Sequence, residues 1–268
     1  MPTDRYIRYT PNMPTLEERR SDWQARWEEV KPDVFRYTRE VLPGLYQVRT
    51  RGSKAYLAID GKDITLIDTG GPGSGRVVLQ AVRELGHSPG DIRHVLITHC
   101  HLDHVGGLPE VQKEIPARTA VHFADAPHID SDGPLPNPFT HPLLARLLSG
   151  YLIRNDPGRA RVDLHLSDGD ELPVFGGLRV IHAPGHTAGS ISLHFPERGL
   201  LIVGDAMQYK FGRLMLPSRL FTQDPPAASE SVQKLAQLDF ETLCFSHFRP
   251  ILEGADLRVR ELARSLAS

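Results

Sequence analysis

Residues 97–107 read Ile97-Thr98-His99-Cys100-His101-Leu102-Asp103-His104-Val105-Gly106-Gly107, which places three imidazoles and one carboxylate close together. Before this stretch, residues 92–98 form an apolar, β-branched run of strand length, and the glycine pair after it leads into a candidate helix. The cluster is therefore predicted on a strand-to-helix loop, where a rigid scaffold can hold converging side chains. Imidazole and carboxylate groups are common ligands of divalent metals, so the stretch predicts a metal site.

Cys100 interrupts this cluster but is not expected to be a ligand. In an extended backbone successive side chains point to opposite sides, so His99 and His101 can share a direction that Cys100 does not. We therefore expect the two histidines to serve one ion. Asp103 continues the alternation and His104 departs from it, and these two residues at the turn are expected to serve a second ion. The alternative is an exposed polar run that happens to be rich in histidine.

The His-x-His-x-Asp-His form of the stretch resembles the motif of the metallo-β-lactamase fold superfamily. Further positions resemble other motifs of that superfamily in the same order, over roughly residues 40–250. Asp68, in the run 66–71, is similar to a structural aspartate of the superfamily, and His186, in 183–190, is similar to its third histidine. Asp205, in 204–206, is similar to a bridging carboxylate, and His247, in 246–248, is similar to the last ligand.

The order of predicted elements suits an α/β fold with two β-sheets packed face to face and helices outside, a four-layer αββα sandwich in a single domain. Strands are predicted at 34–40, 45–49, 55–59, 64–68, 92–98, 120–122, 162–166, 178–182, 190–195, 200–203 and 242–245, and helices at 76–85, 143–152, 224–238 and 256–266. Residues 1–32 are interpreted as an N-terminal arm and helix, and residues 33–268 as the metallo-β-lactamase-like domain.

Two segments have unusual composition. The span 126–160 combines three closely spaced prolines with an apolar, helix-compatible run, and we interpret it either as a lid or pocket wall inserted into the domain or as a helix that caps the sandwich. The glycine-rich run 70–75 lacks the Gly-Lys-Ser/Thr ending of a phosphate-binding loop. It is predicted to be a flexible turn that opens the following helix.

Composition excludes several classes of protein. Lys and Arg total 31 against 33 for Asp and Glu, so no charge field favours nucleic acid. No apolar segment approaches the roughly 20 residues needed to cross a bilayer, and no export signal is visible, so a cytoplasmic protein without membrane contact is expected. Only Cys100 and Cys244 are present, which predicts free thiols. An apolar stripe with Trp23 and Trp27 predicts a helix that docks on the first sheet, with a substrate-binding role and a homodimer contact as alternatives.

The resemblance implies a metal-dependent hydrolase with two divalent ions, zinc first and manganese or iron as alternatives. One ion would be held by His99, His101 and His186. The other would be held by Asp103, His104 and His247, with Asp205 between the two. A hydroxide that bridges the ions would attack a carbonyl carbon, and Asp103 would act catalytically by steering it and passing a proton to the leaving group.

The expected substrate is a small ester, lactone or thioester, as in the lactonase and glyoxalase branch. The chain shows neither the export signal of a secreted β-lactamase nor the C-terminal extension of the hydroxyacylglutathione type. Tyr209, four residues after Asp205, either takes part in lactone binding or packs. Two other functions stay open: a mononuclear-iron persulfide dioxygenase, which the intact His101 disfavours, and a non-catalytic, metal-stabilised binding protein.

Overall fold

The computed structural model describes residues 38–131 and 135–266. The predicted arm and helix at 1–32 lie outside the described residues, as does the first part of the strand predicted at 34–40, so the proposed domain division stays a prediction. No helix in the described ranges is long and apolar enough to span a membrane. Both cysteines are free and buried, as expected.

A seven-stranded sheet runs in the order β1-β2-β3-β4-β5-β6-β7. Its strands are β1 (Thr38–Leu42), β2 (Leu45–Arg49), β3 (Lys54–Asp60), β4 (Asp63–Ile67), β5 (Ile92–Ile97), β6 (Arg118–His122) and β7 (Leu164–Leu166). The first four are antiparallel neighbours, as the sequence predicts. From β4 to β7 the pairing is parallel. The loops that follow β4, β5 and β6 therefore leave the sheet at the same edge, which is where parallel sheets gather functional residues.

The second sheet has five strands in the order β14-β11-β10-β9-β8. They are β8 (Glu171–Leu172), β9 (Leu178–His182), β10 (Ile191–Phe195), β11 (Leu200–Ile202) and β14 (Thr242–Cys244). Strands β8 to β11 pair antiparallel, and β14 joins β11 in parallel. A separate hairpin of β12 (Gln208–Lys210) and β13 (Arg213–Met215) follows β11 in sequence.

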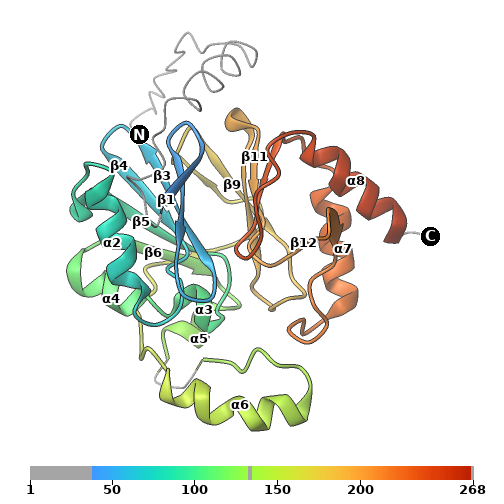
Figure 1. The fold of residues 1–268 in the computed structure, drawn as a ribbon, viewed down its shortest axis with the longest axis horizontal. Coiled ribbons are helices and arrows are strands. Elements are labelled where there is room, and N and C mark those ends of the chain that lie inside the picture. The colour runs from blue at the N-terminus through green and yellow to red at the C-terminus, as the bar shows by residue number, and fades with distance from the viewer. Residues whose placement is uncertain (1–37, 132–134, 267–268) are drawn as a thin grey trace, which may run out of the picture. The chain divides into compact units, whose positions relative to one another are not determined.

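Helices cover the outer face of each sheet (Figure 1). Helices α2 (Ser74–Glu84) and α4 (Leu108–Glu114) lie on the seven-stranded sheet, and α7 (Pro225–Leu235) and α8 (Ala255–Leu266) lie on the five-stranded one. Within the described residues, buried apolar side chains form one cluster under each helix layer and one between the sheets. The predicted four-layer αββα sandwich is therefore confirmed.

The sequence of β5 shows why the layers form. Val95 and Ile97 belong to the cluster under α2 and α4, whereas Leu96, between them, belongs to the cluster between the sheets. Successive side chains of a strand point to opposite faces, and both faces of this sheet are covered. A continuous apolar run is the pattern that such a strand requires.

The segment between β6 and β7 contains α5 (Ala126–Ile129) and α6 (Pro142–Arg154). None of the side chains of α6 is fully buried, and Leu143 and Leu147 are 58% and 68% exposed. The strand-free stretch before α6 is attached to the loop before α7, because the Thr140 hydroxyl donates to the carbonyl oxygen of Arg219 at 2.8 Å. Helix α6 therefore does not bury its apolar side chains in a core over the sandwich, and its role as a lid stays a prediction.

Candidate metal centre

The loop after β5 brings the first histidines to the sheet edge. His101 precedes α3 (Leu102–Val105), and its carbonyl oxygen accepts hydrogen bonds from the backbone N–H groups of His104 at 2.9 Å and Val105 at 3.1 Å. The extended backbone directs His99 and His101 to the same space. The helical turn then rotates His104 back into that space, which explains why it departs from strand alternation.

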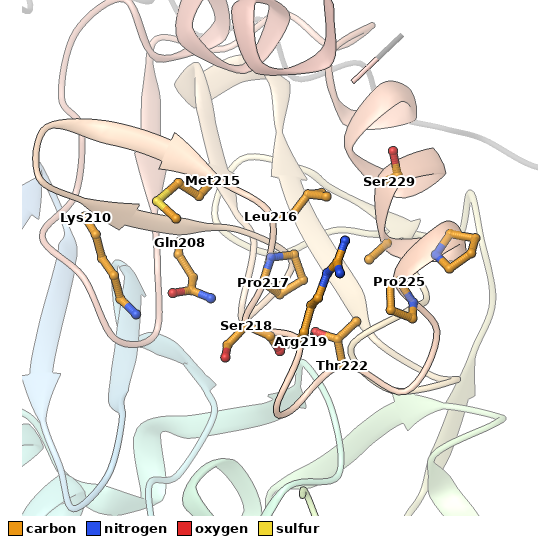
Figure 2. Close-up of a pocket in the computed structure, with 12 residues that line it drawn as sticks. Gln208, Lys210, Met215, Leu216, Pro217, Ser218, Arg219, Thr222, Pro225 and Ser229 are labelled. Atoms are coloured by element: carbon orange, nitrogen blue, oxygen red, sulfur yellow. Dashed lines mark hydrogen bonds between the residues drawn. The ribbon is translucent and has the colours of Figure 1, made fainter. Parts of the chain in front are cut away.

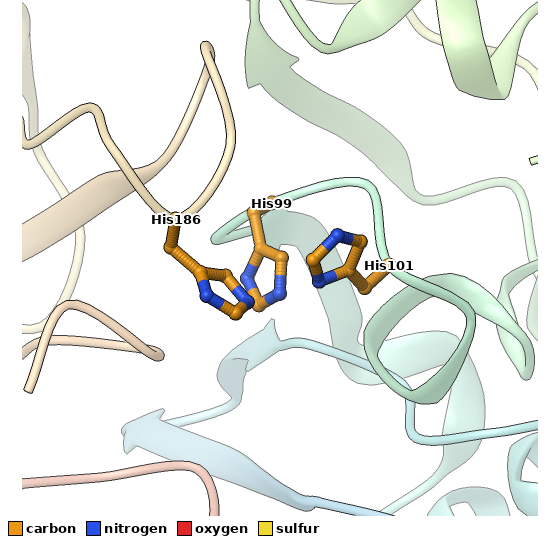
Figure 3. Close-up of side chains that lie close together, drawn as sticks. All are labelled: His99, His101 and His186. Atoms are coloured by element: carbon orange, nitrogen blue, oxygen red, sulfur yellow. The ribbon is translucent and has the colours of Figure 1, made fainter. Parts of the chain in front are cut away.

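His99, His101 and His186 converge on one point from two loops (Figure 3). The ring centroids lie 4.8 Å apart for His99 and His101, 4.7 Å for His99 and His186, and 4.6 Å for His101 and His186. One ligand atom of each lies within 4.8 Å of the others, and all three side chains are buried. His186 lies in the loop between β9 and β10, so the two sheets each contribute to this group.

A second group consists of Asp103, His104 and His247. Asp103 Oδ2 lies 3.8 Å from His104 Nε2 and 3.4 Å from His247 Nε2. Asp205 lies between the two groups, because its Oδ2 is 3.5 Å from His186 Nε2 and 3.0 Å from His247 Nε2. The structure thus brings together all seven side chains that the sequence suggested as ligands.

The electrostatics of the first group suit a cation. Burial, followed by the neighbouring imidazoles, lowers the pKa of His99 and of His101 well below the usual value. Burial also lowers the pKa of His186, against the opposing charge of Asp205. The rings are therefore neutral at neutral pH, and their lone pairs are available to a metal.

Buried polar atoms in the centre lack partners among the described residues. They are Nε2 of His99, His101 and His104, both ring nitrogens of His186, and Oδ1 of Asp205. A buried polar group without a hydrogen bond costs about 1–3 kcal/mol, so such a concentration of unpaired atoms needs a ligand to compensate it. A set of imidazole nitrogens and carboxylate oxygens, with no thiolate, fits zinc, manganese or iron.

Asp68 supports the centre without joining either group. Its carboxylate accepts hydrogen bonds from the backbone N–H and the hydroxyl of Thr98, each at 2.8 Å, and its Oδ2 lies 2.8 Å from Nδ1 of His104. This contact places the His104 proton on Nδ1 and leaves Nε2 facing the centre. Burial disfavours the charged form of His104, but the carboxylates of Asp68, Asp103 and Asp205 outweigh it and raise the pKa to about 10.

The glycine-rich run 70–75 packs closely against the metal loop. Gly107 N–H donates to the Gly70 carbonyl oxygen at 2.9 Å, and both the backbone N–H and the hydroxyl of Thr69 donate to the carbonyl oxygen of His104 at 2.8 Å. A Cβ atom on Gly107 would lie 2.5 Å from the Thr69 carbonyl oxygen. The run forms the predicted turn that opens α2, and it also supports the histidine loop, a contact that the sequence did not show. Its flexibility stays a prediction.

Two supporting residues were missed from the sequence. Lys54 holds both sides of His247, since its backbone N–H donates to the Ser246 carbonyl oxygen and its Nζ donates to the Phe248 carbonyl oxygen, each at 2.8 Å. Asp125 is the second, and it accepts hydrogen bonds from both histidine loops. Tyr209, in contrast, stacks on Phe245 with the ring centroids 6.1 Å apart, so it packs in the fold.

Cys100 points away from the two groups into the apolar cluster under α2 and α4. Burial, followed by the charge of Asp125, raises the pKa of its thiol, so the thiolate form that binds metals is disfavoured. We expect Cys100→Ser to keep the metal content and the hydrolysis rate within about twofold, with a stability loss of about 1 kcal/mol. Elemental analysis and steady-state kinetics check this. The variant His101→Ser, which should lose metal, is measured in parallel. Metal loss in the cysteine variant would show that its thiol is a ligand.

A pocket of about 610 Å³ lies between the β12–β13 hairpin and the start of α7 (Figure 2). Its wall includes the basic residues Lys210 and Arg219 beside Met215 and Leu216. Two contacts connect the pocket with the loops of the centre: Lys210 Nζ lies 5.6 Å from the ring centroid of Phe248, and Gly185 packs closely on Ala228. The pocket is therefore adjacent to the loops that carry His186 and His247.

The sequence profile of the metallo-beta-lactamase superfamily matches residues 48–247, which includes every residue of both groups. The chain belongs to this superfamily. It is 27% identical to "Probable metallo-hydrolase YflN" of Bacillus subtilis over 247 residues, which cover 85% of this chain and 93% of that protein. It is also 33% identical to a hydroxyacylglutathione hydrolase of Cereibacter sphaeroides over 171 residues, which cover 63% of this chain and 52% of that enzyme.

Solved structures of the superfamily share the fold. A metallo-beta-lactamase family protein from Thermus thermophilus matches with a TM-score of 0.66 and 25% identity, over 84% of this chain and 80% of that one. The Rm3 metallo-beta-lactamase matches with a TM-score of 0.63 and 21% identity, over 87% and 92%. Together with the histidine and aspartate groups, membership of the superfamily makes the chain a metal-dependent hydrolase.

Proposed function

We propose that the chain hydrolyses a small ester, lactone or thioester with two divalent ions, preferably zinc. The observation that supports this proposal is the pair of ligand groups at one sheet edge, with Asp205 within 3.7 Å of His104, His186 and His247. Most of the donor atoms are imidazole nitrogens, which suits zinc, with manganese and iron as alternatives. When bound, such ions polarise a carbonyl group and lower the pKa of a bound water.

Asp103 is the proposed proton carrier. Its side chain is 38% exposed, the most accessible carboxylate of the centre, so it can meet a substrate while Asp205 stays enclosed. The backbone of Asp103 is held in place, because the Ser53 hydroxyl donates to the Asp103 carbonyl oxygen at 2.5 Å. A Cβ atom on Gly52 would come 2.6 Å from Asp103 Cβ. A carboxylate held in this way can take a proton from the attacking water and pass it to the leaving oxygen or sulfur.

The basic pocket supports a substrate with a negatively charged portion. Lys210 and Arg219 line it, and it borders the loops of His186 and His247. The similarity to a hydroxyacylglutathione hydrolase agrees with such a substrate. Among the apolar residues of the β12–β13 hairpin, Met215 lines the pocket, whereas Phe211 is 98% exposed. We therefore rank thioesters and acidic esters ahead of uncharged lactones.

A substrate panel tests the proposal. The zinc-loaded full chain should turn over a glutathione thioester, nitrophenyl esters or acyl-homoserine lactones, with little activity on bis-nitrophenyl phosphate. Elemental analysis should find close to two ions per chain, and Asp103→Asn should reduce kcat at least about a hundredfold with metal retained. Glu171→Gln, an exposed carboxylate change on β8, serves as the control and should leave kcat unchanged.

Three results would contradict the proposal. One ion per chain with oxygen consumption on a persulfide would indicate a dioxygenase. Full metal occupancy without turnover of any ester, lactone or thioester would indicate a binding protein. Dominant phosphodiester turnover would show that the basic pocket accepts a different class of substrate.

A further inference from the structure

We propose that Asp125 is a positioning residue for the metal centre: its buried carboxylate joins the loop of His99 and His101 to the loop of His186 and fixes their separation. This inference rests on the metal centre of the proposed function. Among the described residues, no hydrogen bond joins the Asp125 side chain to any of these three histidines, so its role is to place the backbones that carry them.

The contacts of Asp125 reach both loops. Its Oδ2 accepts a hydrogen bond from the backbone N–H of Cys100 at 2.9 Å, and Cys100 lies between the two histidines of its loop. The same oxygen accepts from the hydroxyl of Thr187 at 2.7 Å, and Oδ1 accepts from the backbone N–H of Gly189 at 2.7 Å. Thr187 directly follows His186. One carboxylate therefore fixes the backbone between His99 and His101 and the residues just after His186.

The environment leaves this carboxylate little freedom. Asp125 is 1% exposed, and a Cβ atom on Gly189 would lie 2.5 Å from its carboxyl carbon, so the second loop is packed directly on it. Asp125 occupies the position before α5, where an aspartate commonly caps the helix, yet its side chain forms no cap hydrogen bond. The side chain instead crosses to the two loops, which belong to different sheets of the sandwich.

The chemistry of the contacts requires a carboxylate. The two backbone N–H groups can only donate, and they approach different oxygens of Asp125. An asparagine has a similar shape, but one of its two terminal atoms is an NH₂ group. In either orientation this group would face a backbone N–H, so Asn cannot satisfy both loops. Asp125→Asn is therefore expected to separate the loops almost as effectively as Asp125→Ala.

Asp163 provides a matched control. Its Oδ2 also accepts a backbone hydrogen bond, from Thr119 N–H at 2.9 Å, and Thr119 lies on β6, the strand that precedes Asp125. It pairs with Arg161 at 2.6 Å, and none of its hydrogen bonds among the described residues reaches either histidine loop. Asp163→Asn should therefore lower stability without changing the metal centre. Thr187→Val, which removes only one of the three donors to Asp125, should have a smaller effect than Asp125→Asn.

The test compares the full-length variants in two arms. In the metal-free protein, hydrogen exchange of the backbone amides of Cys100 and Gly189 should rise by at least about tenfold in Asp125→Asn and not in Asp163→Asn. In competition titrations, Zn²⁺ affinity should fall roughly 10- to 100-fold in Asp125→Asn. At saturating zinc, kcat should fall more than KM changes, and the absorption spectrum of the Co²⁺-loaded variant should shift, because a displaced His186 alters the ligand geometry.

The outcomes separate this inference from the proposed function. Unchanged exchange and unchanged zinc affinity in Asp125→Asn, with a lower melting temperature only, would make Asp125 a purely structural residue and overturn the inference. Equal losses of zinc affinity in the Asp163 control would do the same, because they would show a general effect of destabilisation. A normal zinc affinity in the wild type without any acyl hydrolysis would contradict the proposed function and leave the positioning role intact. A wild-type chain that binds no zinc would overturn both.

Discussion

Asp205→Asn is expected to reduce kcat/KM for acyl hydrolysis at least about a hundredfold and to lower the number of bound ions. Asp205 is the only described carboxylate within 3.7 Å of His104, His186 and His247 together, and its Oδ1 has no hydrogen-bond partner among the described residues. Burial opposes its ionisation, but the charge of His104 and the hydrogen bond with His247 lower its pKa below the usual range. The charge that links the two groups is therefore present at any working pH.

The measurement is zinc stoichiometry by elemental analysis together with steady-state kinetics at saturating zinc. Asparagine retains the size of the side chain, so loss of activity reports the loss of charge and of one metal-binding oxygen. Asp256→Asn is the control, because Asp256 pairs with Arg260 on α8 at 2.6 Å and lies outside the centre. Full activity with two ions in Asp205→Asn would show that Asp205 does not link two metal sites.

Asp68→Asn is expected to lower the free energy of unfolding of the metal-free protein by about 3–5 kcal/mol and zinc affinity by roughly 10- to 100-fold. Asp68 has φ = 57°, a left-handed conformation that asparagine tolerates, so this variant avoids backbone strain. What it removes is the buried charge opposite His104, whose Nδ1 lies 2.8 Å from Asp68 Oδ2. An amide NH₂ group there would face the N–H of His104 or of Thr98.

The stability of the metal-free protein should depend on pH through the protonation of His104. The folded-state pKa of His104, about 10, is above the ordinary value of 6.5, so its protonation stabilises the metal-free fold fully below pH 6.5. That contribution is lost as pH rises from 6.5 through about 10. Urea unfolding of the chelator-treated protein at several pH values should show this decline in the wild type and a much flatter profile in Asp68→Asn. Equal profiles would mean that Asp68 does not hold the proton of His104.

The groups of the centre were predictable because their signals are local or belong to known motifs. His99, His101, Asp103 and His104 are adjacent in sequence, and the apolar run before them fixes the end of β5. The longer strands also follow their apolar patterns, so β2 and β9 begin and end where predicted. The short strands of the β12–β13 hairpin have three residues each, too few to show a period.

Asp125 was not predictable from local pattern, because an aspartate before a helix is ordinarily interpreted as a cap. Its role depends on the parallel order of β4, β5 and β6, which places the residue after β6 beside the loop after β5. The signal that could have identified it is an acidic residue at the carboxyl end of the strand next to the histidine loop. Lys54 could not be found in this way, since its partner Phe248 lies 194 positions away in sequence.

The supply of ligands from both sheets has a consequence for the stability of the whole domain. His99 and His101 follow a strand of the first sheet, whereas His186, Asp205 and His247 follow strands of the second. An ion shared between them acts as a removable cross-link across the sandwich and closes chain loops that the unfolded polypeptide leaves open. Metal binding and folding are thus linked, and an ion that binds the folded chain and not the unfolded one raises the free energy of unfolding by mass action.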